Sequence, residues 1–206
     1  MQNKILVLDL ETTNNPDRNY RHEIIEIAVI VVDNGIVEKE NIFHTLVRPP
    51  CRIQPRNFSV SGISDLMVEK APTIDQVLPD LLNFLGNHPI VGHNISSFDF
   101  RVLNEQLRER GLEELQNAII DTLVLSKKLF KGEKAHNLDA LMTRLGIVLD
   151  SNQQRHRAAE DVRYNALVLL KLLEILREKG IVTLEDVINF CSKNPAGPTG
   201  KQTTLF

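Results

Sequence analysis

The chain has 206 residues, of which 42% are hydrophobic and 25% are charged, and its formal net charge is −3. This composition is typical of one globular domain and excludes a largely disordered chain. The negative charge excludes a protein whose whole surface attracts polyanions, so a nucleic-acid substrate would need bound cations or a local basic rim. Two distant cysteines form neither a disulfide framework nor a zinc site. The first apolar run is too short and too acidic for a signal peptide or membrane span, so we expect a soluble, cytoplasmic protein.

The first part of the chain predicts β-strands. Residues 4–10 form a compact apolar run that is typical of a buried central strand. Residues 24–33 are rich in β-branched side chains and predict a second strand. Asn34-Gly35 is a strong hairpin signal, so residues 36–47 should return antiparallel to that strand.

The later segments predict helices alternating with short strands. Pro49, Pro50 and Pro55 indicate an irregular crossing. Strands are expected at 89–92 and 118–121, and helices at 73–85, 96–110, 137–145, 158–176 and 184–191. Gly146 and Gly180 lie where two of these helices should end. The order predicts an α/β three-layer fold with a mixed sheet flanked by helices on both faces.

The chain divides into three predicted parts. Residues 1–178 should form the main domain, and residues 179–191 a short C-terminal helical extension. Residues 192–206 are rich in proline, glycine and threonine, which is typical of a flexible tail.

Two carboxylates lie at the end of the first predicted strand. Because side chains alternate along a strand, Asp9 and Glu11 should point to the same face. Close carboxylates repel, so the pair is costly unless a cation or a shared proton lies between them. Taken alone, an Asp-x-Glu pair is better explained as an exposed strand end.

Three further polar residues change this interpretation. Asp99 begins a predicted helix beside Phe98, where the helix dipole alone would favour an acid. His156 and Asp161 lie five positions apart near the start of the longest predicted helix, where an exposed capping arrangement is the usual explanation. Together, the Asp9–Glu11 pair, Asp99 and the His156–Asp161 pair indicate one common site.

These motifs resemble the DEDD superfamily of 3′→5′ exonucleases, in its His-containing branch, most closely the epsilon (proofreading) subunits of bacterial DNA polymerase III. The resemblance implies an RNase H-like fold and covers about residues 5–176. The matching segments are Leu8-Asp9-Leu10-Glu11-Thr12-Thr13, His93-Asn94 with Phe98-Asp99, and His156-Arg157-Ala158 with Asp161, together with Ile25-Glu26-Ile27, Ser61-Gly62-Ile63 and Ala71-Pro72-Thr73.

The resemblance implies hydrolysis of a phosphodiester with release of nucleoside monophosphates, assisted by two divalent ions. Carboxylate oxygens suit Mg²⁺ or Mn²⁺. Asp9 would bridge both ions, Glu11 and Asp161 would complete the first site, and Asp99 would hold the second ion. His156 would act as the general base, because imidazole titrates near neutral pH.

The same resemblance implies a DNA substrate with a single-stranded or frayed 3′ end. Thr12 and Thr13 would hold the terminal nucleotide, Ile63 and Phe98 would make apolar contacts to bases, and His93 is a substrate-binding candidate that equally fits a buried structural histidine. Two alternatives stay open: an RNA 3′ exonuclease of the same branch, similar to oligoribonuclease, and a non-catalytic clamp- or DNA-binding module.

The last five residues resemble the peptides with which replication and repair proteins bind a sliding clamp. Gln202 would make polar contacts, and Leu205 and Phe206 would fill an apolar pocket. A frayed terminus with two chance apolar residues is the alternative. A DNA polymerase is a second partner that the resemblance suggests, and no membrane partner is expected.

Overall fold

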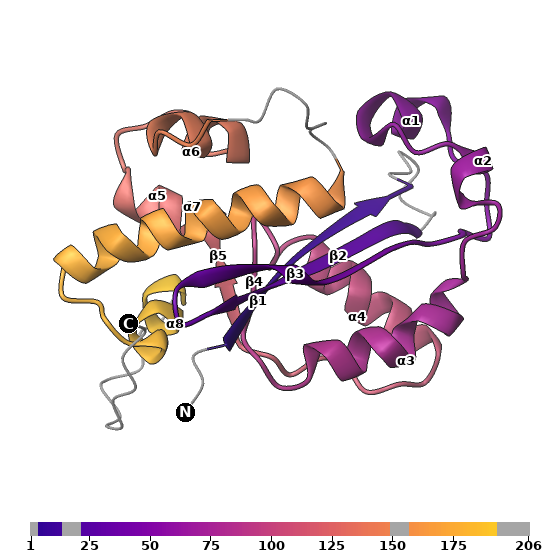
Figure 1. Cartoon of the computed structure of the whole chain (residues 1–206), viewed down its shortest axis with the longest axis horizontal. Helices are drawn as coiled ribbons and strands as arrows, with labels where there is room; N and C mark the ends of the chain where they lie inside the picture. Colours follow the sequence, from indigo (N-terminus) through magenta and orange to yellow (C-terminus); the bar gives the residue numbers. More distant parts are fainter. Residues whose placement is uncertain (1–3, 14–21, 149–156, 193–206) are drawn as a thin grey trace.

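We describe residues 4–13, 22–148 and 157–192 in a computed structural model of the chain. A five-stranded mixed sheet with the order β3-β2-β1-β4-β5 forms its centre (Figure 1). The strands pair antiparallel from β1 to β3 and parallel from β1 through β4 to β5. They are β1 (Lys4–Thr12), β2 (Ile24–Asp33), β3 (Ile36–Leu46), β4 (Ile90–Gly92) and β5 (Ile119–Asp121).

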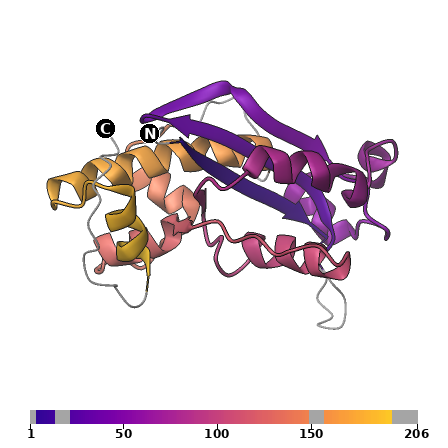
Figure 2. The same cartoon turned by 90° about the horizontal axis from the view of Figure 1, so that it is seen from below.

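Helices cover both faces of this sheet, which confirms the predicted three-layer α/β fold. One face carries α3 and α4, and the other carries α5 to α8. Figure 2, seen from the α3–α4 side, shows these two helices in front of the sheet and α7 behind it. The helices are α1 (Pro55–Ser61), α2 (Asp65–Val68), α3 (Ile74–Leu85), α4 (Asp99–Glu109), α5 (Thr122–Leu129), α6 (Leu138–Arg144), α7 (Ala158–Glu178) and α8 (Leu184–Cys191).

The alternation of β1 determines which side chains meet which helices. Ile5 and Val7 pack toward α7, whereas Leu6 and Leu8 pack toward α3 and α4. All four are almost completely buried, as expected for a central strand between two helical layers. Asp9 and Glu11 continue the series of Ile5 and Val7, so the fold directs them to the α7 face.

The proline-rich crossing is more regular than predicted. Helix α1 begins at Pro55, and the prediction of an irregular crossing through this residue was wrong. Proline is well tolerated at the first helical position because its missing N–H has no partner there anyway. The helix ends at Gly62, which has a left-handed φ of 68°.

Other boundaries differ from prediction by a few residues. Helix α4 begins at Asp99 and not at residue 96, because the chain turns through Asn94, whose φ of 65° is left-handed. Gly146 and Gly180 follow α6 and α7 with left-handed φ, as their predicted role as helix stops requires. Among the described residues, no helix has the length and apolar character needed to cross a membrane.

Candidate active site

Figure 1 shows the end of β1 near the start of α7, and three carboxylates from these two elements form a cluster. Asp9 and Glu11 come from β1, and Asp161 comes from the first turn of α7. One oxygen from each lies within 4.8 Å of the others, which is close enough to share a metal ion. Asp161 is buried on the inner face of α7, beside Val162, because that face packs on the sheet. Residues that are 150 positions apart in the sequence thus form one cluster.

Asp99 reaches the same strand from the opposite helical layer. It is the first residue of α4, and its Oδ1 accepts a hydrogen bond of 3.1 Å from the Leu10 N–H. Leu10 lies between Asp9 and Glu11, so Asp99 adjoins the cluster through the backbone of β1. Burial raises the pKa of Asp99 to about 7, although its two backbone hydrogen bonds act in the other direction.

The electrostatics of the cluster favour a bound cation. Burial raises the pKa of Glu11 to about 8, and the negative charges of Asp161, Glu26 and Asp99 add to this effect. A divalent ion would relieve the same repulsion and keep the carboxylates ionised. The donor set consists of hard oxygens, which fits Mg²⁺ or Mn²⁺ and does not fit a soft metal.

A fifth carboxylate, that of Glu26, lies directly beside Glu11, and the protein itself supplies its counter-charge. Glu26 on β2 is the antiparallel partner of Glu11, and its side chain is fully buried. Arg157 donates to both of its oxygens, at 2.8 Å and 3.1 Å, and the Ala158 N–H donates at 3.0 Å. His44 Nε2 lies 2.8 Å from the same carboxylate. Burial alone would raise the pKa of Glu26, but these hydrogen bonds outweigh it and lower the pKa to about 2.

A second polar network supports the loop that leads to Asp99. The buried carboxylate of Asp121 accepts hydrogen bonds from the backbone N–H groups of Asn94 and Ser96, at 3.0 and 3.2 Å. Gly92 starts this loop, and a Cβ there would lie 2.6 Å from Ile95, so only glycine fits. Asp121 therefore fixes the backbone that carries Asp99 into place.

His93 belongs to this supporting network in the structure. Its Nδ1 lies 3.1 Å from Thr122 Oγ1, and Thr122 in turn donates to Asn165 on α7 at 3.0 Å. The ring is only partly buried. These contacts fit a structural role for His93. Its predicted contact with the substrate stays a proposal.

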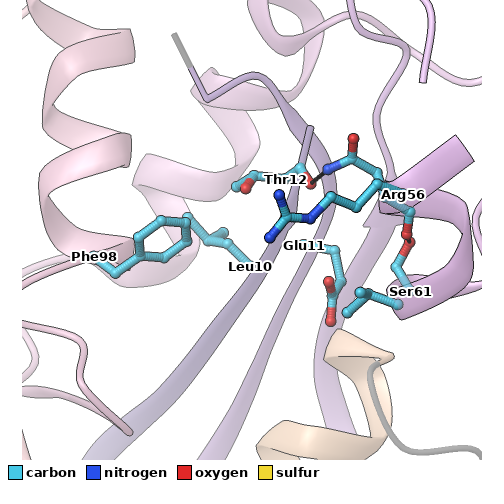
Figure 3. Close-up of a pocket in the computed structure, with 8 residues that line it drawn as sticks. Leu10, Glu11, Thr12, Arg56, Ser61 and Phe98 are labelled. Atoms are coloured by element: carbon cyan, nitrogen blue, oxygen red, sulfur yellow. Dashed lines mark hydrogen bonds between the residues drawn. The ribbon is translucent and has the colours of Figure 1, made fainter. Parts of the chain in front are cut away.

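A pocket opens beside Glu11, between β1, α1 and the start of α4 (Figure 3). Arg56 reaches across it from α1 toward Thr12 and Leu10, whereas the Glu11 carboxylate points the other way (Figure 3). Arg56 and Val60 are four residues apart on α1, so both face the pocket. The lining residues are Leu10, Glu11, Thr12, Arg56, Asn57, Val60, Ser61 and Phe98.

The pocket contains some of the predicted substrate-binding residues and not others. Thr12 and Phe98 line it. Thr13 lies just beyond, where its hydroxyl accepts a hydrogen bond of 3.1 Å from the Glu23 N–H. Ile63 is completely buried in a small cluster with Ile25 and Val68, so its side chain offers no surface to a base. The predicted apolar contact of Ile63 with a base stays a proposal, and it would require this side chain to become exposed.

Hydrogen bonds attach α1 to the end of β1. The Asn57 amide donates to the Thr12 carbonyl at 3.4 Å, and the Ser61 hydroxyl donates to the Asn57 carbonyl at 3.1 Å (Figure 3). Both side chains are buried. The first bond links α1, one wall of the pocket, to the end of β1, and the second lies within α1.

Sequence reasoning missed Arg56, Asn57 and the role of Glu26. The predicted irregular crossing hid the i, i+4 pattern of α1, which was the available signal for Arg56. Glu26 was noted only as part of a matching segment, and no local pattern indicates its partner. The predicted base His156 and the tail residues Gln202, Leu205 and Phe206 lie outside the described residues.

The sequence and the fold match known exonucleases. Residues 6–169 match the RNase_T family, which is described as exonuclease. DNA polymerase III subunit epsilon of Aquifex aeolicus is 32% identical over 171 residues, covering 83% of this chain and 81% of that subunit. The structure of exonuclease X in complex with 5′ overhanging duplex DNA has a TM-score of 0.72 at 26% identity, covering 91% and 99% of the two chains. The predicted RNase H-like fold is thereby confirmed.

One relative is much longer than this chain and is similar to it over a small part of its length. DNA polymerase III PolC-type of Thermotoga petrophila is 35% identical over 185 residues, which are 89% of this chain. The chain spans only 13% of the length of that polymerase. The match thus concerns one region of a much longer protein.

Proposed function

The chain belongs to the RNase_T family of exonucleases, and from this premise we propose that it is a metal-dependent 3′→5′ exonuclease acting on DNA 3′ ends. It would remove mispaired or damaged ends during proofreading or repair and release nucleoside monophosphates. The observation that carries the proposal is the cluster of Asp9, Glu11 and Asp161, whose oxygens lie within 4.8 Å of one another beside a pocket.

These residues would hold two divalent ions, Mg²⁺ or Mn²⁺. Asp9 would contribute to both ions, Glu11 and Asp161 to the first, and Asp99 to the second. When bound, the ions would activate the attacking water and neutralise charge on the phosphate. The raised pKa of Glu11 supports this assignment, because a carboxylate crowded by others gains most from a cation.

The side chains around the cluster would orient the strand. Thr12 and Phe98 line the pocket next to Glu11 and are placed to contact the terminal nucleotide. Arg56 provides a cationic side chain at the same pocket and would meet a phosphate oxygen. Such a local cation would offset the overall negative charge of the chain.

His156 would accept the proton from the attacking water, as the family motif implies. In the sequence it directly precedes Arg157, which is the N-cap residue of α7. His156 is not part of the proposed ligand set, so its role can be separated from metal binding by mutation.

DNA is favoured over RNA by the relatives. One relative is a polymerase III subunit, and exonuclease X was solved with duplex DNA. An RNA 3′ exonuclease would use the same catalytic residues, because none of their proposed roles involves a 2′-hydroxyl. A non-catalytic module is disfavoured, since all five predicted catalytic residues are present in the sequence.

The proposal extends to partners and to the division of the chain. The likeness to polymerase III proteins supports a polymerase as partner and work on DNA in the cytoplasm. Gln202, Leu205 and Phe206 would bind a sliding clamp from a flexible tail at 192–206. The main domain would span 1–178 with an extension at 179–191, and the described part of this extension includes α8, whose Val187 packs in the main core.

The proposal is tested with oligonucleotides labelled at the 5′ end and Mn²⁺ or Mg²⁺. We expect stepwise shortening from the 3′ end, fastest for single-stranded or mispaired DNA and slower for matched DNA and RNA. Faster digestion of RNA would favour the RNA alternative. No hydrolysis of any substrate, at several metal concentrations, would contradict the proposed function.

A further inference from the structure

The ion pair between Glu26 and Arg157 has a position that stability alone does not explain. Arg157 donates to Glu26 through Nε and an Nη atom, and the Glu26 side chain is completely buried. Replacing such a buried pair with apolar residues is often neutral or stabilising, so the pair is weak evidence of a contribution to folding. Its location next to the carboxylate cluster suggests another role.

The pair connects the two elements that supply the cluster. Glu26 lies opposite Glu11 in the antiparallel register of β1 and β2. Opposed residues of an antiparallel pair point to the same face, so both carboxylates are directed to the α7 side. Arg157 is the residue immediately before α7, and Asp161 follows four positions later in its first turn.

Glu26 also holds the helix itself. Its second oxygen accepts the N–H of Ala158, the first residue of α7, at 3.0 Å. This N–H is one of the helix-terminal donors that lack a partner within the helix. The carboxylate thus binds a side chain and a backbone group on consecutive residues, which fixes both the position and the direction of the helix start.

The occupied oxygens separate Glu26 from the metal ligands. Arg157, the Ala158 N–H and His44 use its lone pairs, and Glu26 is not among the carboxylates whose oxygens lie together. Arg157 also places a positive charge near Glu11. Glu26 is therefore equipped to orient the cluster without joining it.

We infer that Glu26 and Arg157 are positioning residues, which set the start of α7, and so Asp161, relative to Asp9 and Glu11. The inference rests on the proposed function. Loss of the Glu26–Arg157 pair should reduce the turnover rate and leave the pocket that binds the strand unchanged.

The test measures kcat and KM on single-stranded DNA, and Mn²⁺ binding by calorimetry, for Glu26→Gln, Arg157→Gln and the double variant. We expect each single variant to lower kcat about 10- to 100-fold, as partners of metal ligands typically do. KM should stay unchanged. The double variant should be no slower than the slower single variant, because the two residues act as one unit.

Lys171→Gln is the matched control, since Lys171 is an exposed cation on the same helix that pairs with Glu174 at 2.9 Å. It should leave kcat unchanged. A full wild-type kcat in folded Glu26→Gln and Arg157→Gln would overturn the inference, as would additive effects in the double variant. Loss of one bound Mn²⁺ in Glu26→Gln but not in Arg157→Gln would also overturn it, because Glu26 would then act as a ligand and not through the pair.

Two observations keep the outcomes distinct. If a single variant does not fold because it leaves the other charge without its partner, the double variant decides, since it removes both charges at once. An inactive wild-type protein would contradict the proposed function itself. If the wild type is active, Asp9→Asn is inactive, and Glu26→Gln and Arg157→Gln both keep full activity, only the positioning role is contradicted.

Discussion

Glu11 and Glu26 are direct partners across β1 and β2, yet their carboxyl groups have opposite electrostatic states. Burial and three neighbouring carboxylates raise the pKa of Glu11 to about 8, whereas hydrogen bonds from His44, Arg157 and Ala158 outweigh burial and lower that of Glu26 to about 2. Two identical side chains on the same face thus differ in the pKa of their carboxyl groups. Glu26 already has its counter-charge, and Glu11 is left to a cation.

Removal of a carboxylate from the cluster should abolish activity. Asp9→Asn and Asp161→Asn each remove a proposed metal ligand, and we expect kcat to fall more than roughly 100-fold. That figure is the upper range for substitutions of residues that only support metal ligands. Without metal, each variant should unfold at a higher temperature than the wild type, because the repulsion is relieved. Oligonucleotide digestion and thermal denaturation in EDTA measure these effects. An Asp9→Asn protein with near wild-type activity would overturn the assignment of the site.

The stability of the metal-free protein should fall as pH rises. The pKa of Glu11 is raised from 4.5 to about 8 and that of Asp99 from 3.8 to about 7, so between these limits the folded state binds more protons than the unfolded state. Stability present below about pH 4 is then lost progressively up to about pH 8. Glu26, with its lowered pKa, acts in the opposite direction at lower pH.

Thermal denaturation in EDTA from pH 5.5 to 8.5 measures this effect. The melting temperature should decrease across the range, and saturating Mn²⁺ should largely remove the decrease by binding the ionised carboxylates. Glu11→Gln is the control and should remove the part of the decrease that Glu11 contributes, while the part due to Asp99 remains. A melting temperature that rises with pH in EDTA would contradict the crowding of charges described for the site.

His156 should control the pH dependence of the rate. If it is the general base, kcat should rise through the titration of an imidazole, and His156→Ala should remove this limb. Mn²⁺ affinity should change little, because His156 is not proposed as a ligand. Steady-state kinetics at several pH values and calorimetry decide between the roles. Lost metal binding with an unchanged pH profile would contradict the assignment.

Arg56 should contribute to binding the strand rather than to the chemical step. A hydrogen bond to a charged group contributes about 1.5–3 kcal/mol, so Arg56→Ala should raise KM about tenfold or more. It should also weaken the dependence of KM on salt, because one phosphate contact is lost. Arg52→Ala is the control, as Arg52 is exposed nearby but does not line the pocket. An unchanged KM in Arg56→Ala would exclude the contact.

The tail should bind a sliding clamp. We expect a peptide of residues 200–206 to bind the clamp of the same organism with a Kd in the micromolar range, corresponding to about −8 kcal/mol. Deletion of Leu205 and Phe206 should abolish binding and leave digestion of a short free oligonucleotide unchanged. Calorimetry with the full-length protein measures the affinity. Absence of binding at high protein concentration would leave the tail without this role.

Much of the fold was predictable because its signals are local. The apolar run of β1, the β-branched residues of β2 and the apolar spacing of α7 each predict an element within a few residues of its observed bounds. The prediction failed at Pro55, where one proline is compatible with both a helix start and an irregular segment. Local signals cannot decide between two conformations that the same residue permits.

The sequence by itself determined that two carboxylates of the site share one face, because Asp9 and Glu11 are two residues apart on a strand. Only the tertiary structure decided which carboxylate is neutralised by the protein. Glu26 and Arg157 are 131 residues apart and meet through the packing of α7 on the sheet. No sequence period encodes that contact, because it depends on the arrangement of whole elements. The pKa of a carboxyl group depends on the groups that the fold packs around it, and for this reason Glu11 and Glu26 differ.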